Sequence, residues 1–126
     1  MKLLLLGLLF AMTATAAETL EDFRWKKRLL VVTGDGALVS DKLAPAKQGL
    51  AERDVRVFFL NDPAVDDALA RSLSGRLKVR AGVAEVLLLG KDGRTTLRWT
   101  AEEFTIPALF AKIDAMPMRR AEMRGD

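Results

Sequence analysis

Two aspartates are the residues best placed for acid–base or metal chemistry. Asp35 follows the apolar run of residues 29–32, and Asp62 follows residues 55–60, which are mostly β-branched or aromatic. Such runs are typical of parallel strands, and open α/β sheets bind ligands at the carboxyl ends of those strands. The pair therefore predicts a polar site that could carry out metal-assisted or general-acid hydrolysis. Turn chemistry is the competing interpretation, because Gly34 and Gly36 flank Asp35 and a proline follows Asp62.

Positive side chains form a second group of candidates. Lys26, Lys27 and Arg28 are consecutive and follow Trp25, and Lys91 lies in a Gly-Lys-Asp-Gly turn. Such a group can hold a phosphate-bearing headgroup, a polysaccharide or an acidic partner. Solvated charge at the start of a strand is the alternative, with Trp25 anchoring the lead-in to the core and Lys91 serving only a turn.

The last candidates are Arg119 and Arg120, which follow a Met-Pro-Met sequence near the end of the chain. Positive charge at the end of a helix is already favoured by the helix dipole, without any ligand. The two flexible methionines are apolar, however, and suit a segment that folds back on the domain. We therefore expect residues 118–126, a basic C-terminal tail, to dock on the domain and to contribute to recognition.

The residue types that are missing exclude several classes of chemistry. The 126 residues include no cysteine and no histidine. Disulfide exchange, thiol peroxidase chemistry, thiolate or imidazole metal sites and Ser/His or Cys/His nucleophilic catalysis are therefore excluded. The spacing of the acidic residues matches no calcium loop, so we expect no metal and no cofactor. A net charge of +3 is too small to indicate a nucleic-acid partner.

The first 17 residues have the pattern of a secretory signal peptide. Lys2 gives a short positive region, residues 3–12 are apolar, and Ala14-Thr15-Ala16 is a small-residue cleavage pattern. The apolar stretch is about half the length needed to cross a bilayer, and no later stretch is longer. We expect cleavage near Ala16 or Ala17, a periplasmic or secreted product, and no transmembrane segment in the mature chain.

The rest of the chain predicts one domain, residues 18–117, with strands and helices in the order β-α-β-α-β-β-α. Apolar or β-branched runs predict the strands, and an Asp-Gly turn predicts that the last two form a hairpin. Candidate N-caps predict that the helices start at Ser40 or Asp41, at Asp62 and at Thr105. Pro45 should delay or kink the first helix, Gly75 should end the second, and Met116-Pro117 the third.

This order of elements resembles the thioredoxin fold, an α/β three-layer sandwich with a central mixed sheet. That fold carries a Cys-x-x-Cys pair at the start of its first helix, five residues before a proline. Counting back from Pro45 places the pair at Ala37 and Ser40. The expected proline before the third strand is absent as well, since residues 80–83 read RAGV. The resemblance thus implies the fold without its redox chemistry.

Three phrases also resemble the DUDES family, whose members occur in exported bacterial proteins and in animal sushi-repeat and extracellular-matrix proteins. They are residues 23–30 (FRWKKRLL), 90–93 (GKDG) and 113–120 (IDAMPMRR). The resemblance implies a thioredoxin-like domain outside the cell, with roles in adhesion and matrix assembly in animals. It implies no catalytic residue.

We therefore expect an exported, thiol-free domain that binds an envelope or extracellular protein or an anionic surface. The alternative is a cysteine-independent enzyme that uses Asp, Arg or Lys at the carboxyl edge of the sheet. A third possibility is a structural partner whose tail mediates oligomerisation. Convergence of Asp35 and Asp62 in a concave pocket would favour catalysis, whereas a contiguous basic or apolar patch would favour binding.

Overall fold

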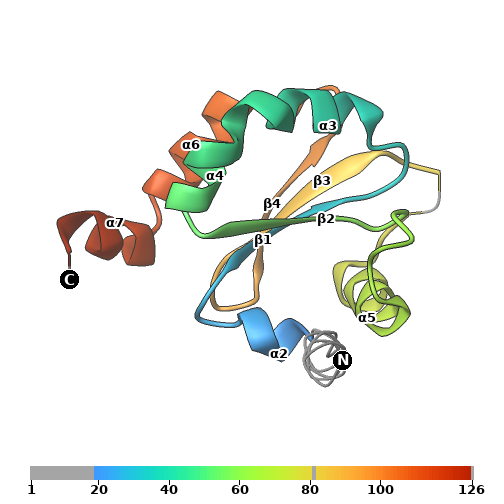
Figure 1. Cartoon of the computed structure of the whole chain (residues 1–126), viewed down its shortest axis with the longest axis horizontal. Coiled ribbons are helices and arrows are strands. Elements are labelled where there is room, and N and C mark those ends of the chain that lie inside the picture. Colours follow the sequence, from blue (N-terminus) through green and yellow to red (C-terminus); the bar gives the residue numbers. More distant parts are fainter. Residues whose placement is uncertain (1–18, 81, 126) are drawn as a thin grey trace, which may run out of the picture.

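A four-stranded mixed sheet forms the centre of the protein, as a computed structural model that describes residues 19–80 and 82–125 shows (Figure 1). Its spatial order is β2-β1-β3-β4. β1 (Arg28–Val32) pairs in parallel with β2 (Val55–Phe59) and antiparallel with β3 (Glu85–Leu89), which forms a hairpin with β4 (Thr95–Thr100). The predicted α/β fold class, with a mixed sheet between helical layers, is confirmed.

Helices cover both faces of the sheet (Figure 1). One face carries α3 (Ala37–Leu43), the 3₁₀ turn η1 (Ala44–Ala46), α4 (Lys47–Glu52) and α6 (Ile106–Asp114). The other face carries α2 (Leu20–Phe23) and α5 (Asp67–Leu77). A last helix, α7 (Pro117–Arg124), extends beyond the end of α6.

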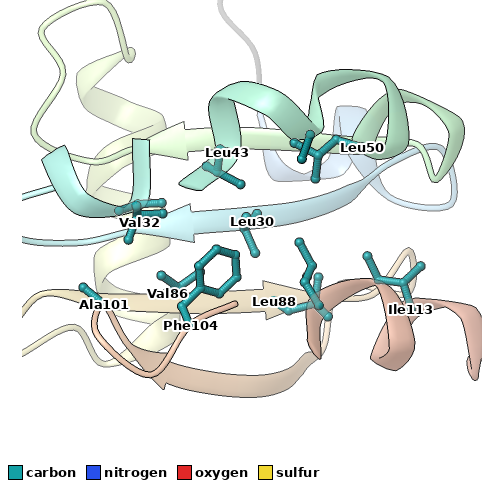
Figure 2. Packing of buried hydrophobic residues seen from close by; sticks show 12 residues of the cluster. Leu30, Val32, Leu43, Leu50, Val86, Leu88, Ala101, Phe104 and Ile113 are labelled. Atoms are coloured by element: carbon teal, nitrogen blue, oxygen red, sulfur yellow. The ribbon is translucent and has the colours of Figure 1, made fainter. Parts of the chain in front are cut away.

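β1 is buried along its whole length because it is covered from both sides. Leu30 and Val32 point into the core under α3, α4 and α6, whereas Leu29 and Val31 point into the core over α5. Figure 2 shows the first of these cores, where Leu30 and neighbouring strand residues meet side chains of the helices. The unbroken apolar run of β1 is the sequence signal of this two-sided burial.

Two helix starts differ from the prediction because aspartates in the preceding loops satisfy the first amides. α3 begins at Ala37, whose N–H donates to the Asp35 carboxylate at 3.0 Å, and not at Ser40 or Asp41. α5 begins after Asp66, whose carboxylate accepts the Leu69 amide at 3.3 Å, four residues beyond Asp62. For α5 the error is a wrong choice between two good capping residues, whereas α3 has Gly36 at its N-cap and no side-chain cap there.

Other helix signals have mixed outcomes. Pro45 lies in the 3₁₀ turn that breaks the helical layer, and Thr105 accepts the Ala108 amide at the start of α6, both as predicted. α5, however, continues past Gly75 to Leu77 and ends at Lys78, which adopts a left-handed conformation with φ of 53°.

Candidate functional site

At the carboxyl ends of the parallel strands β1 and β2, the chain forms one turn after each strand. The Asp35 carboxylate accepts the Ala37 amide, and the Asp62 carboxylate accepts the Ala64 amide at 2.9 Å. Asn61 donates to the Gly34 carbonyl at 2.9 Å and so joins the two loops. Each carboxylate is thus used by its own turn, which favours the structural interpretation of this edge over hydrolytic chemistry.

Backbone fills the space next to these turns. Gly34 has a φ of +65°, and a Cβ on it would lie 2.9 Å from the Ala84 Cα and from the Val83 carbonyl oxygen. The Thr33 hydroxyl donates to that same carbonyl and accepts the Glu85 amide, each at 3.1 Å. The loop after β1 therefore lies directly against the segment that enters β3.

Three of the predicted basic residues come together at the opposite edge, around a carboxylate. The guanidinium of Arg28 donates to both oxygens of Glu122, at 3.2 and 3.1 Å, and to the Arg53 carbonyl at 2.8 Å. The Lys91 ammonium donates to Glu122 at 2.8 Å and to Asp54 at 2.9 Å. The Nη1 atom of Arg119 lies 3.7 Å from the Oε1 atom of Glu122, whereas Lys91 donates to the Oε2 atom. We call Arg28, Asp54, Lys91 and Glu122 the Arg28–Glu122 cluster.

The two cations of this cluster are buried, whereas the Asp54 and Glu122 side chains are partly exposed. The side chain of Arg28 is 1% exposed and that of Lys91 is 8% exposed. Burial raises the pKa of Glu122, but the hydrogen bonds from Arg28 and Lys91 outweigh it and leave the pKa below its ordinary value. Within the described residues, the buried Nε of Arg28 has no hydrogen-bond partner.

A second set of ion pairs fixes the first turn of α7. Arg53 donates to both oxygens of Asp114 at 3.0 Å, and Arg119 donates to Asp114 at 3.1 Å and to the Glu52 carbonyl at 3.1 Å. The hydrogen bond from Arg53 is the main cause that lowers the pKa of Asp114, against the effect of burial. Segments from α4, α6 and α7 are thereby held together.

A hollow of about 320 Å³ lies beside the Arg28–Glu122 cluster, and we call it the Trp25 hollow. Its lining combines both buried cations with apolar and hairpin residues: Trp25, Arg28, Gly90, Lys91, Asp92, Thr96, Met116, Pro117 and Met118. The prediction that Trp25 packs into the core is wrong, since this side chain is 57% exposed. Its backbone is left-handed, with φ of 68°, and its amide donates to the Lys91 carbonyl at 2.6 Å.

The remaining predicted site residues lie outside this cluster. Lys26, Lys27 and Arg120 are exposed, and Lys27 also lines a smaller hollow of about 20 Å³. Asp35 and Asp62 follow the carboxyl ends of β1 and β2, whereas Arg28 lies at the start of β1. The segment from residue 118, predicted to be a basic tail, continues α7 almost to the end of the chain.

Sequence reasoning missed Glu122, the residue on which the cluster centres. A signal was present, because Glu122 is the only acidic residue between Pro117 and Gly125, a segment with three arginines. A lone carboxylate in a basic segment commonly has an internal partner. The same signal marks Glu85 at the start of an otherwise apolar strand.

Glu85 is the centre of a separate ion-pair network, which it forms with Arg80 and Arg98. It is 2% exposed and accepts hydrogen bonds from Arg80 at 2.5 Å and from Arg98 at 3.1 Å. The hydrogen bond from Arg80 is the main cause that holds the pKa of Glu85 below its ordinary value, although burial opposes it. Arg98 also donates to the Leu77 carbonyl at 2.7 Å, so the network ties the end of α5 to the sheet.

Two kinds of feature are absent from residues 19–80 and 82–125. In these ranges, no three carboxylates lie close enough to share a metal ion. None of the helices in this part of the chain has the length and apolar character needed to cross a bilayer.

Comparison with solved structures finds proteins of similar fold at low sequence identity. Thioredoxin peroxidase I of Plasmodium yoelii is 15% identical with a TM-score of 0.56, over 84% of this chain and 80% of that one. An N-terminally modified Prx1a of Plasmodium yoelii is 16% identical with a TM-score of 0.57, over 85% and 82%. The reduced 2-Cys peroxiredoxin of Plasmodium vivax is 16% identical with a TM-score of 0.57, over 84% and 72%. This likeness shows a thioredoxin-type fold.

Sequence comparison places the chain in a family whose function is not known. No curated protein matches it. The model of one family, described as a domain of unknown function (DUF4174), matches residues 19–122, which include the strands, the helices of both layers and Glu122. The chain therefore belongs to the DUF4174 family.

Proposed function

We propose that this protein is an exported, thiol-free domain of the DUDES type that acts by binding an envelope or extracellular protein. Its leader pattern supports export, although residues 1–17 lie outside the part that the structure describes. The absence of cysteine supports a role other than redox catalysis, since Ala37 and Ser40 occupy the first turn of α3, where the fold's thiols would lie.

Exposure of Trp25 is the observation that carries the binding role. Tryptophan is enriched in interaction hot spots because it buries much apolar area on contact. Trp25 is also held in a backbone conformation that costs a non-glycine residue about 1 to 3 kcal/mol. A cost of that kind is typical of functional positions, and here it keeps a large aromatic ring at the rim of a hollow that contains two buried cations.

Capture from envelope extract, with wild-type and variant protein as bait, tests this role. Trp25→Ala should lose the captured partner, because it removes the aromatic surface while leaving the core unchanged. Leu38→Ala is the matched control, since Leu38 is 45% exposed but lies on α3 at the other end of the sheet. The control should retain the partner, and equal melting temperatures should show that both variants are folded. Equal capture by wild type and Trp25→Ala would contradict the proposal.

Export has a test of its own. Mass spectrometry of the protein made in its native cell should give a mature chain shorter by about 16 or 17 residues. A product that still begins at Met1 would argue against export.

A further inference from the structure

The two buried cations of the Trp25 hollow have more donors than the protein uses. A guanidinium has five N–H donors and an ammonium has three. The bonds from Arg28 go to Glu122 and to the Arg53 carbonyl, and its Nε has no partner among the described residues. Lys91 donates to Asp54 and Glu122. Donors therefore remain for another acceptor on two side chains that line the hollow.

The lining of the hollow includes apolar side chains as well as the two cations. Trp25, Met116, Pro117 and Met118 contribute apolar surface, and Trp25 and Met118 are well exposed. A volume of about 320 Å³ lies at the lower end of the range for small-molecule sites, roughly 300 to 1,000 Å³. Such a site suits a small molecule with an apolar body and one anionic group.

Glu122 already places a carboxylate on these cations, and its helix is held there mainly by polar contacts. No side chain of α7 is fully buried. Arg119 fixes the first turn to Asp114 and to the Glu52 carbonyl, whereas Glu122 binds the later turns to Arg28 and Lys91. Replacement of the Glu122 carboxylate on Arg28 and Lys91 would release this link of the later turns, while Arg119 keeps the first turn, with Pro117 and Met118, in the wall of the hollow.

We propose that the Trp25 hollow binds a small amphipathic monocarboxylate, whose carboxylate replaces that of Glu122 on Arg28 and Lys91 and whose apolar body lies against Trp25 and Met118. Charge balance supports the exchange. The cluster contains two cations and two carboxylates, so departure of Glu122 leaves one positive charge that a ligand carboxylate restores. Glu122 then acts as an internal occupant of the site. The inference goes beyond the proposed capture of a protein partner, with which it shares Trp25 and the hollow.

Titration with octanoate, followed by tryptophan fluorescence, tests the site directly. The full mature chain with Trp99→Phe is the parent, so that Trp25 is the only reporter. Octanoate should change the fluorescence saturably, and octanol, of the same length but uncharged, should bind at least about tenfold more weakly because it lacks charge-assisted hydrogen bonds.

Two variants in this parent test the exchange with Glu122. Glu122→Gln should tighten octanoate binding about tenfold, because the competing charge is removed. Lys91→Met should weaken it about tenfold, and Lys112→Met, an exposed lysine on α6, should leave it unchanged. Saturating octanoate should also speed tryptic cleavage after Arg120 and Arg124, which lie in the part of α7 that must move. Melting curves establish that each variant is folded.

Equal affinity for octanoate and octanol, or an octanoate affinity that neither Glu122→Gln nor Lys91→Met changes, would overturn the inference. Absence of octanoate binding would do the same. If capture from envelope extract still depends on Trp25 in that case, only this inference fails. If octanoate binds as expected but capture does not depend on Trp25, only the proposed partner binding fails.

Discussion

At Gly34, the loop after β1 lies in close contact with the segment before β3. Its φ is positive, and a Cβ placed on it would lie 2.9 Å from backbone atoms of Ala84 and Val83, so there is no room for a side chain. Gly34→Ala should lower the free energy of unfolding by about 2 to 4 kcal/mol, through left-handed strain and overpacking together. Thermal and urea unfolding measure this loss.

Gly75 provides the matched control for that substitution. It lies within α5, and a Cβ on it would meet nothing within 4 Å. Gly75→Ala should therefore raise stability by up to about 1 kcal/mol, as alanine does in a helix. If both substitutions had the same small effect, the close approach of the two segments would be wrong.

Glu85 predicts how stability depends on pH. Its pKa is lowered in the folded state from an ordinary value of 4.5, chiefly by the hydrogen bond from Arg80. A depressed carboxyl pKa contributes stability that is complete above the unfolded value and is lost as the pH falls through the folded value. Stability should therefore fall as the pH decreases below about 4.5. Asp114 and Glu122, whose pKa values are also lowered, should add to this loss.

Glu85→Gln should flatten this acid dependence, because the amide does not titrate. The variant should also be less stable at neutral pH, since Arg80 and Arg98 lose a charged acceptor. Denaturant unfolding between about pH 3 and pH 7 gives the two curves, with Glu102→Gln on an exposed loop as the control. Parallel curves for wild type and Glu85→Gln would exclude this carboxyl as a source of the dependence.

Individual side chains were the least predictable feature of the site. Arg28, Lys91 and Arg119 could be chosen from the sequence as basic residues with unusual neighbours, but their common partner Glu122 lies 94 residues from Arg28. A local pattern singles out Glu122 as the lone acidic residue of its segment, but it does not say which distant residue is its partner. Trp25 was also misplaced: its side chain is exposed, and its amide is bonded to the carbonyl of Lys91, a residue far away in the sequence.

At the scale of the elements, removal of α7 tests how much its ion pairs contribute to the free energy of unfolding. Ending the chain at Met116 removes Glu122 and leaves Arg28 and Lys91 buried with one carboxylate fewer. An uncompensated charge of this kind is costly, so the truncation should lower the free energy of unfolding by about 1 to 3 kcal/mol. Chemical denaturation of the truncated and full-length chains measures the difference.

A chain that ends at Arg124 is the control for this truncation, because it keeps α7 and lacks only residues 125 and 126. It retains Glu122, so its stability should remain within about 0.5 kcal/mol of the full chain. Should the Met116 truncation also unfold at the wild-type denaturant concentration, the ion pairs of α7 would contribute nothing to stability.

The order and type of the main elements were predictable because strands and helices leave strong local patterns. The runs of β1, β2 and β3 and the Asp-Gly turn before β4 determined the predicted sheet. The start of α6 at Thr105 was predictable, but the starts of α3 and α5 were not, because Asp35, Asp41, Asp62 and Asp66 are all acceptable caps. Tertiary contacts of the loops decide among them.

For the whole molecule, the absence of sulfur nucleophiles predicts inertness in redox assays. The purified protein should show no insulin reduction and no thiol peroxidase turnover, because no residue can form a thiolate. Its electrophoretic migration should be the same with and without reductant. Turnover that copurifies with the protein through successive columns would disprove this prediction.

The ion pair between Arg28 and Glu122 also joins parts of the chain that are synthesised far apart. Arg28 starts β1, which lies in the middle of the sheet, and its partner Glu122 follows it by 94 residues. Every intermediate on the ribosome that precedes Glu122 therefore holds this guanidinium without its carboxylate. The pair can form only after Glu122 has been added and has emerged from the ribosome, so α7 is joined to β1 later than the strands on either side of β1 become available.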